Sequence, residues 1–584
     1  MRRAALARFA AFLALLPAAA NASEHRYALS MMHFNVQYVA GGLVGSHLAK
    51  DPATAPDDRE VEDGIVKQSF EPVLDLYLAH PTWGGDVEMQ GYMLDVIAER
   101  HPDVLEKLRT LANAGRLEVV SFHYSDQLFV GHAKEDWERS AQLNQATFAK
   151  HGVPLGKAVF CQEGQSSEGM AAAMTSHGYR TLVWPKNLFS YQHQGLQPKP
   201  LYQFGGARML TSNGLTYTEG TETLNVTWTF VDDGELLATG GINPYIWDAF
   251  VVNPKAVADY EASVVALEQQ GFQVITVSSY VDAISSWVTP AIPPPLLDGT
   301  WQPGSTDGTY RWMGKGGLEE RDGDVRSALA LAHRELVLAE TAAQGSGLDA
   351  RARLDAGWRV LMLGEVSDAT GVNPWRSEVE YGLAYAAEAL RVARDVIDDA
   401  KAKAGASTVI IDSTTGTFTA GTEMAAARTD EDPPFALAID GARGGVVTWQ
   451  KATDGHHIAT VTFSPTGSRE ASVRFPGSGD EIVYTPALAD TPVHRKRADF
   501  TFDHFDLALH DGLIGLGGGR WVVKDQAFVH VGARVRIDAT DVQFHEDTMS
   551  GDDTVTWVFH VLDADEATAV AFAGSLNLRP RAVR

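Results

Sequence analysis

The sequence predicts an α/β protein in three parts: a (β/α)7-like barrel over residues 23–305, a three-helix bundle over 306–405 and an all-β sandwich over 406–584. Between residues 25 and 288, short apolar runs alternate with helical patterns, which is typical of repeated βα units on a parallel sheet. Residues 324–402 then show helical periodicity rich in alanine and leucine. After residue 406, Val, Thr, Phe and Gly recur in alternating runs, as they do in β-sandwiches.

Residues 1–22 have the features of a signal peptide. Three arginines precede the apolar run 9–20, and Ala20-Asn21-Ala22 has the small-x-small form that signal peptidase cleaves. A lone anchor helix is the alternative, but the run contains Pro17 and is shorter than the roughly 20 residues that a bilayer needs. We therefore expect cleavage after Ala22 and an exported protein, periplasmic or secreted, with no membrane span.

The elements of the barrel region are predicted from its apolar runs, which indicate strands at 28–32, 117–122, 158–161, 181–184, 225–231 and 273–277. Between the first two lies a long helical stretch that begins near Met89 and ends at Gly115, a residue type that favours helix C-termini. We favour a closed barrel over an open sheet because closure removes the sheet edges. Proline-rich residues 289–295, with those up to about 321, indicate a linker or covering loop, and helices are expected at 324–341, 348–363 and 375–402.

Composition excludes several classes of protein. With 45% hydrophobic and 21% charged residues, the chain is neither largely disordered nor a polytopic membrane protein. A formal charge of −27 repels phosphate backbones, so we expect no nucleic-acid partner. Cys161 is the single cysteine, which excludes an intramolecular disulfide and a multi-thiolate zinc site.

Polar residues just after the predicted strands are candidates for a site, because the active sites of βα barrels lie at the carboxyl ends of the strands. Residues of this kind that could bind sugar hydroxyls are His33, Asn35, Gln37, His123 and Asp126, together with Glu118, which lies inside the strand 117–122. Aromatic faces stack on sugars, so Trp184, at the end of the strand 181–184, is expected to bind substrate as well. For each residue taken alone, a polar group in a surface loop is the alternative.

Carboxylates come after two of the predicted strands. Glu163 comes directly after strand 158–161, where it could act as nucleophile, general base or metal ligand, or could only stabilise a helix N-terminus. Asp232, Asp233 and Glu235 crowd the end of a later strand, although an ordinary Asp-Gly turn is the alternative. Crowded carboxylates raise one another's pKa, and a protonated acid beside an ionised carboxylate is what glycosidic-bond cleavage requires. The sequence contains no phosphate-binding glycine motif and no nucleophile elbow.

Several motifs, taken in order, resemble a known family. His33-Phe34-Asn35 is followed by Trp83, by residues 88–93 (Glu-Met-Gln-Gly-Tyr-Met), by 115–120 (Gly-Arg-Leu-Glu-Val-Val), by 160–164 (Phe-Cys-Gln-Glu-Gly) and by 233–235 (Asp-Gly-Glu). Over roughly residues 27–400, this set resembles the barrel of glycoside hydrolase family 57 and, more distantly, that of the family 38 α-mannosidases. The loop 365–371 is similar to a Ser-Asp turn in the helical domain of both families. The resemblance implies that Glu163 is the nucleophile, that the strand carrying Glu118 builds the substrate cleft, and that the helical bundle reaches over the site.

Two departures from the family pattern matter. Family 38 has His-x-Asp, whose aspartate helps to bind zinc, where this chain has Asn35. Asparagine is a poor zinc ligand, so we expect a metal-free site without a cofactor, as in family 57. The family's acid lies on a segment that here is residues 209–214 and contains no aspartate. The acid is therefore assigned first to Asp233, then to Glu235 or Asp232.

The sequence thus predicts an exported retaining α-glycosidase or transglycosylase that acts on an oligo- or polysaccharide. One alternative is a metal-dependent polysaccharide deacetylase, because Asp232-Asp233 loosely resembles a metal-binding Asp-Asp loop. The other is a glycan-binding protein that kept the barrel and lost its acid.

Overall fold

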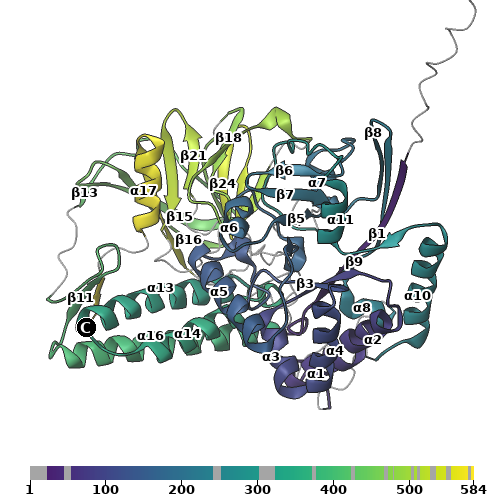
Figure 1. Ribbon diagram of the computed structural model, residues 1–584. Coiled ribbons are helices and arrows are strands. Elements are labelled where there is room, and N and C mark those ends of the chain that lie inside the picture. The colour runs from purple at the N-terminus through teal and green to yellow at the C-terminus, as the bar shows by residue number, and fades with distance from the viewer. Residues whose placement is uncertain are drawn as a thin grey trace, which may run out of the picture.

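The computed structural model describes residues 23–44, 54–240, 251–301, 322–370, 376–421, 428–465, 471–477, 479–501, 505–508, 513–525, 534–546, 554–576 and 581–583. The predicted signal peptide and residues 302–321 of the predicted linker lie outside these ranges. Figure 1 shows the α/β part on one side of the molecule, the long helices on the other, and the antiparallel strands beside both.

Parallel strands form the centre of the α/β part. In the first sheet, β1 (Ser23–Phe34) lies between β2 (Gly85–Met89) and β9 (Glu222–Asp233), and β3 (Leu117–Val120) pairs with β2. In the second, β5 (Thr181–Trp184) lies between β4 (Ala158–Val159) and β7 (Ala207–Thr211). A parallel bridge between Val119 and Leu155 joins the two sheets. The predicted parallel α/β architecture is confirmed. No ladder joins β7 to β9 within the described ranges, so hydrogen bonding there does not close the two sheets into a complete barrel.

Shorter strands and helices surround this core. The strands are β6 (Tyr202–Phe204), β8 (Leu215–Glu219) and β10 (Gln273–Val274). The helices are α1 (Asp58–Gly64), a π-helical turn (Ile65–Phe70), α2 (Glu71–Ala79), α3 (Gly91–Arg100), α4 (Pro102–Asn113), α5 (Lys134–His151), α6 (Met170–Ser176), α7 (Lys186–Gln192), α8 (Gly234–Thr239), α10 (Pro254–Gln269) and α11 (Val277–Ile284).

Strand β2 corrects the prediction of a helical stretch beginning near Met89. The strand ends at Met89, and α3 begins at Gly91. Val87 and Met89 belong to the hydrophobic core on one face of the sheet, whereas Glu88 points to the other face, beside His33. The spacing of Met89 with the apolar residues of α3 imitates a helical face, but pairing of residues 85–89 with β1 and β3 decides for a strand.

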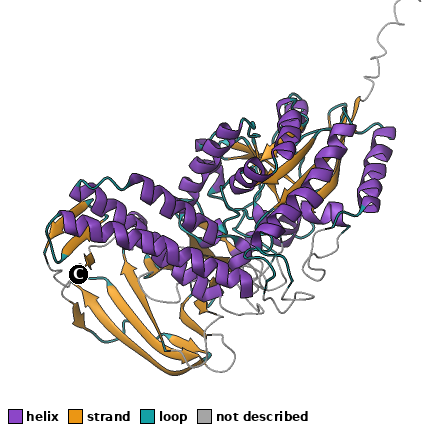
Figure 2. Cartoon of the chain, turned by 90° about the horizontal axis from the view of Figure 1, so that it is seen from below, coloured by secondary structure: helices purple, strands orange, loops and turns teal. Residues whose placement is uncertain are grey.

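The long helices form a second core. Helices α13 (Asp322–Ser346), α14 (Arg351–Gly364) and α16 (Arg376–Lys403) bury Leu329, Leu336, Trp358 and Leu361 among other side chains. The small sheet of β11 (Val409–Asp412), β12 (Thr417–Ala420) and the C-terminal β26 (Arg581–Val583) packs on α13. Figure 2 shows these helices alongside the strands of the C-terminal part.

The C-terminal part contains two antiparallel sheets around one core, as a sandwich predicts. One sheet contains β13 (Arg428–Asp430), β15 (Ala442–Ala452), β16 (His457–Pro465), β25 (Val555–Asp563), β22 (Arg520–Lys524), β21 (Leu513–Gly517), β18 (Glu481–Tyr484) and β19 (Val493–Lys496). The other contains β14 (Ala438–Asp440), β17 (Ala471–Pro476), β24 (Asp541–Glu546), β23 (Arg534–Ile537) and β20 (Phe505–Ala508). The alanine-rich helix α17 (Glu566–Leu576) departs from the all-β prediction and buries Ala569 and Ala573 against the first sheet.

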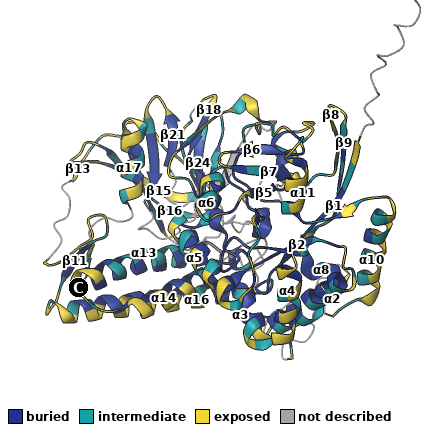
Figure 3. Ribbon diagram, in the orientation of Figure 1, coloured by how far each residue is buried: buried dark blue, intermediate teal, exposed yellow. Residues whose placement is uncertain are grey.

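Burial is distributed according to these layers. Strands β2, β3, β4 and β5 are buried and β9 is mostly half-buried, while the outer faces of α10, α14 and α16 are exposed (Figure 3). No helix among the described residues combines the length and the hydropathy that spanning a bilayer requires.

Candidate active site

Six acidic side chains meet where the parallel strands end. Glu88 lies next to the last residue of β2, Glu163 comes after β4, and Asp233 ends β9. The carboxylate cluster, as we call it, consists of Glu88, Asp126, Glu163, Asp233, Glu235 and Asp368, and their mutual repulsion is part of the electrostatics of Asp126 and Glu163. These groups therefore gather at the carboxyl ends of the strands, where the sequence analysis expected the site.

His33 is the cation of this cluster. Because side chains alternate along β1, Leu29, Met31 and His33 lie on the inner face of the parallel sheet. There His33 Nδ1 contacts Glu88 Oε2 in a buried ion pair. Burial alone would lower the pKa of His33. Attraction to Glu88, and more weakly to Glu235 and Asp233, outweighs it and raises the pKa to about 9. His33 is therefore positively charged at neutral pH.

Glu163 is held in an unusual backbone conformation. Its φ of 56° and ψ of 19° lie in the left-handed region, which costs a non-glycine residue about 1–3 kcal/mol and occurs mainly at functional sites. Trp301 fixes the residue, because its backbone N–H donates to the Glu163 carbonyl at 2.9 Å and its indole Nε1–H donates to Oε2 at 3.0 Å. Gly164 permits this approach, since a Cβ there would lie 2.7 Å from Trp301 Cβ.

The charge of Glu163 is set by opposing effects. Burial and repulsion by Asp233, Asp368 and Glu235 raise its pKa well above the usual range of a glutamate. The hydrogen bond from Trp301 opposes this rise, and Gln162 Nε2 donates a second one to Oε1 at 2.8 Å. The N–H donor on each oxygen stabilises the ionised form of Glu163 against burial and the neighbouring acids.

The three carboxylates at the end of β9 have different surroundings. Asp232 is exposed, pairs across the ladder with Met32, and accepts from its neighbour's backbone N–H at 3.0 Å. Asp233 is half-buried, and burial raises its pKa to about 6 against the attraction of His33. Glu235 is fully buried, accepts from the Asn35 backbone N–H, and has its pKa raised to about 8 by burial, with a further contribution from Asp233. The structure buries Glu235 and half-buries Asp233 in the cluster, whereas Asp232 is exposed and acts only through its charge, which helps to raise the pKa of Asp233.

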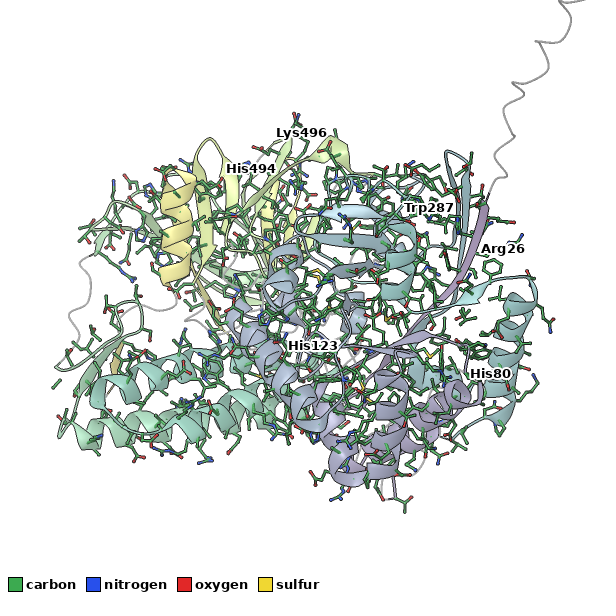
Figure 4. All side chains as sticks on the ribbon, viewed as in Figure 1. Arg26, His80, His123, Trp287, His494 and Lys496 are labelled. Carbon is green, nitrogen blue, oxygen red and sulfur yellow. The ribbon has the colours of Figure 1, made fainter. Side chains whose placement is uncertain are left out.

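Asp126 and His123 lie deeper in the cluster, in the interior of the molecule, where Figure 4 labels His123. His123 Nδ1–H donates to the Ser125 carbonyl, and burial lowers the pKa of this histidine to about 4. Burial, together with repulsion from Glu88 and the other acids, raises the pKa of Asp126 well above its usual range. Both are residues that the sequence analysis assigned to substrate binding.

The helical part contributes Asp368, on the short helix α15 (Ser367–Thr370). Its Oδ2 accepts from Asn35 Nδ2 at 2.9 Å, and burial and repulsion by Asp233 raise its pKa to about 8. The loop before α15 is fixed to the barrel, because the backbone N–H of Ser367 donates to the Asp126 carbonyl at 2.8 Å. Gln127 Nε2 also donates to Glu365 Oε2 at 2.6 Å. The helical part therefore reaches the site through this loop.

Three residues predicted to bind substrate are placed elsewhere. Gln37 donates to the Tyr381 hydroxyl at 2.9 Å and accepts from Ser125 Oγ at 2.8 Å, so it ties the barrel to the helical part. Glu118 lies at the amino end of β3 and accepts from the Ser278 backbone N–H at 3.0 Å, at the N-terminus of α11. Trp184 points away from the barrel interior into a hydrophobic core, because alternation along β5 turns its neighbour Val183 inward.

Glu88 and Trp301 belong to the site but were not among the predicted residues, and Asp368 was included only as part of the loop 365–371. Glu88 was quoted only as part of a helix-opening motif, and the alternation of Val87 and Met89 was the signal for a strand that would turn it inward. Trp301 comes after the proline-rich segment and was taken as part of a linker. Its ring stands edge-on to His33 at 6.3 Å between centroids, so one indole contacts both the cation and Glu163.

No family model matches the chain. A stretch of 92 residues, 15% of this chain, is 26% identical to α-amylase 1 of Dictyoglomus thermophilum and spans 13% of that protein's length. The fold matches an α-mannosidase from Enterococcus faecalis V583 with a TM-score of 0.58 and 8% identity, over 96% of this chain and 90% of that chain. It also matches a GH57-type branching enzyme from Pyrococcus horikoshii, with a TM-score of 0.43 and 12% identity, over 64% of this chain and 88% of that one.

The names of these structural neighbours include glycoside hydrolases of families 57 and 38. The resemblance predicted from the ordered motifs is confirmed at the level of the fold by the matches to the Enterococcus faecalis proteins. At 8% identity, the match to the α-mannosidase shows a shared fold along nearly the whole chain.

The zinc-binding His-x-Asp pair of the family 38 pattern does not fit this chain. Asn35 Oδ1 accepts from the Gln37 backbone N–H at 2.6 Å and from Gln90 Nε2 at 2.9 Å, while Nδ2 donates to Asp368. Both ends of the amide are therefore used in hydrogen bonds. Asn35 positions the carboxylates around it rather than offering a lone pair to a metal.

Proposed function

We propose that this protein is an exported retaining α-glycosidase or transglycosylase that acts on α-linked glycans. The observation that carries the proposal is the arrangement of Glu163, held in left-handed backbone with a donor on each carboxylate oxygen, near the half-buried Asp233. A nucleophilic carboxylate and a nearby acid are the two groups that retaining glycosidic cleavage needs. The name of the Dictyoglomus relative and that of the Enterococcus structure support a substrate with α-linkages.

In the first step, a carboxylate oxygen of Glu163 attacks the anomeric carbon as the glycosidic C–O bond breaks. The acid transfers its proton to the departing oxygen, which leaves a glycosyl ester on Glu163. In the second step, water or a sugar hydroxyl gives a proton to the same acid, now ionised, and attacks the anomeric carbon to release Glu163. A water acceptor gives hydrolysis, and a sugar acceptor gives transglycosylation.

Asp233 is our choice for the acid. It is partly accessible, and its carboxyl makes no hydrogen bond within the described residues. Glu235 is fully buried, and its Oε1 is engaged by the Asn35 backbone N–H, so it is less able to reach a leaving oxygen. A pKa raised to about 6 leaves Asp233 partly protonated near neutral pH, as a general acid requires.

The test compares Asp233→Asn with the wild type on two substrates. On an unactivated oligosaccharide the variant should lose at least about 10³-fold in kcat/KM, because the leaving group needs the proton; this equals about 4 kcal/mol of barrier. An aryl glycoside, whose phenolate departs without a proton, should still form the glycosyl-enzyme. The matched control is Asp232→Asn, which removes the neighbouring exposed carboxylate and should retain wild-type rates on both substrates.

Replacing Glu163 with Gln tests the nucleophile. The amide keeps the shape of the side chain, so the fold should persist while turnover on both substrates is lost. Equal losses on both substrates for Asp233→Asn would remove that residue from the acid role. Stoichiometric sugar binding without turnover by the wild type would instead favour a glycan-binding protein.

A further inference from the structure

Three side chains on the β2 and β3 side of the carboxylate cluster converge. Glu88, His123 and Asp126 each offer one ligand atom, and these atoms all lie within 4.8 Å of one another. All three side chains are fully buried. We propose that they form a site for one divalent transition-metal cation, Zn²⁺ in the first place, with a coordination position left for water or a substrate hydroxyl. The cation site stands independently of the proposed glycosidase activity.

Each of the three side chains has at least one atom without a partner. Within the described residues, neither carboxylate oxygen of Asp126 has a hydrogen-bond partner, and the same holds for Glu88 Oε1 and His123 Nε2. Buried polar groups are nearly always hydrogen-bonded, and an ionised carboxylate is costly to bury unless it is paired or coordinates a metal. Three buried side chains with such atoms, whose possible ligand atoms lie within 4.8 Å of one another and which pair with no lysine or arginine in the described ranges, are therefore well suited to hold a cation.

The opposite sides of the same groups are already held. His123 Nδ1–H donates to the Ser125 carbonyl, which fixes the tautomer and leaves the lone pair on Nε2. Glu88 Oε2 contacts His33 Nδ1, which leaves Oε1 free. In metal sites, ligating imidazoles and carboxylates are usually oriented by hydrogen bonds from backbone or charged groups. His123 and Glu88 thus each have one atom anchored by the protein and another that is available as a ligand.

The donor set indicates the kind of cation. One imidazole and two carboxylates, with a fourth position open, match the three protein ligands of catalytic zinc sites. Bonds of about 2.0–2.2 Å in tetrahedral geometry separate ligand atoms by about 3.5 Å, so atoms that lie within 4.8 Å of one another must approach by about 1.3 Å at most. Side-chain rotation of Asp126, which no hydrogen bond restrains, can supply that movement.

This site differs from the zinc site that the family 38 pattern implies. It uses neither Asn35 nor the His33 Nε2 atom, and it lies on β2 and on the loop after β3. The sequence analysis predicted a metal-free site because Asn35 is a poor ligand. That argument did not consider Glu88. The sequence analysis predicted a helix beginning near this residue, and only the strand β2 shows that its side chain points inward.

Zinc binding can be measured without any substrate. Untagged protein is stripped with a chelator, dialysed free of it, and titrated with ZnCl₂ by calorimetry and by thermal unfolding. We expect one Zn²⁺ per chain and a thermal midpoint that rises with zinc concentration, because a cation that binds only the folded state stabilises it. Asp126→Asn should weaken binding at least about 100-fold and abolish the zinc-dependent rise.

The same variant separates loss of binding from loss of folding. Without zinc, Asp126→Asn should unfold at the same or a higher temperature than the stripped wild type, because the change removes a buried carboxyl group that the neighbouring acids repel and breaks no hydrogen bond of the described residues. Asp232→Asn, which removes an exposed charge, should bind zinc as the wild type does. Stripped wild type that takes up no zinc, or takes up Ca²⁺ or Mg²⁺ in its place, overturns the proposal. Unchanged affinity in Asp126→Asn does so as well.

Discussion

Replacing Trp301 with Phe isolates the hydrogen bond that prepares Glu163 for attack. The indole Nε1–H lies 3.0 Å from Glu163 Oε2, while a phenyl ring retains most of the packing against His33 and Phe160. A hydrogen bond to a charged group is worth about 1.5–3 kcal/mol, and each 1.36 kcal/mol is a factor of ten. Without the bond, burial and the neighbouring acids raise the pKa of Glu163 further, so less of the residue is ionised.

The expected result is a fall in kcat/KM of about 10- to 150-fold on the acidic limb of the pH–rate profile, with that limb moved to higher pH. Trp184→Phe is the matched control. It removes the same indole nitrogen from a buried tryptophan in the outer core, where the Nε1 atom has no hydrogen-bond partner. The control should lose stability without a change in the profile. A Trp301→Phe enzyme whose profile stays within about twofold of the wild type refutes the reasoning.

Three further predictions concern the pKa of Asp233, the structural role of Glu118 and the cleavage of the signal peptide. Because burial raises the pKa of Asp233 to about 6, activity that needs its proton should decline as the pH rises above about 6, and a pH–rate profile checks this. Glu118→Gln should lower the thermal midpoint, at a cost of about 1–3 kcal/mol, because the new amide meets the backbone N–H of Ser278. Its rate per folded molecule should be unchanged, and a lowered rate would return Glu118 to the substrate site. Exported protein should begin at Ser23 by intact mass, and retention of residues 1–22 would contradict the signal peptide.

The sequence by itself was enough to predict where the candidate catalytic carboxylates lie along the chain. Apolar runs with carboxylates after them placed Glu163 and Asp233 at strand ends, and parallel strands bring their carboxyl ends to one edge. The parallel core, the long helices and the sandwich were also predictable from periodicity, because amphipathic periods of 3.6 and 2 are local properties. The residue types at the end of a strand are equally local, so neighbouring positions in the sequence are enough to find them.

Tertiary structure decided which of these groups meet and what charge they carry. Trp301 reaches Glu163 across 138 positions, and Asp368 reaches Asn35 across 333. Such contacts depend on how separate elements pack, which no local period encodes. The inward turn of Glu88 depended on β2 pairing with β1 and β3, although its local spacing also suits a helix. Raised carboxyl pKa values and the unpartnered oxygens of Asp126 likewise arise from burial, because desolvation is a property of the whole packed core.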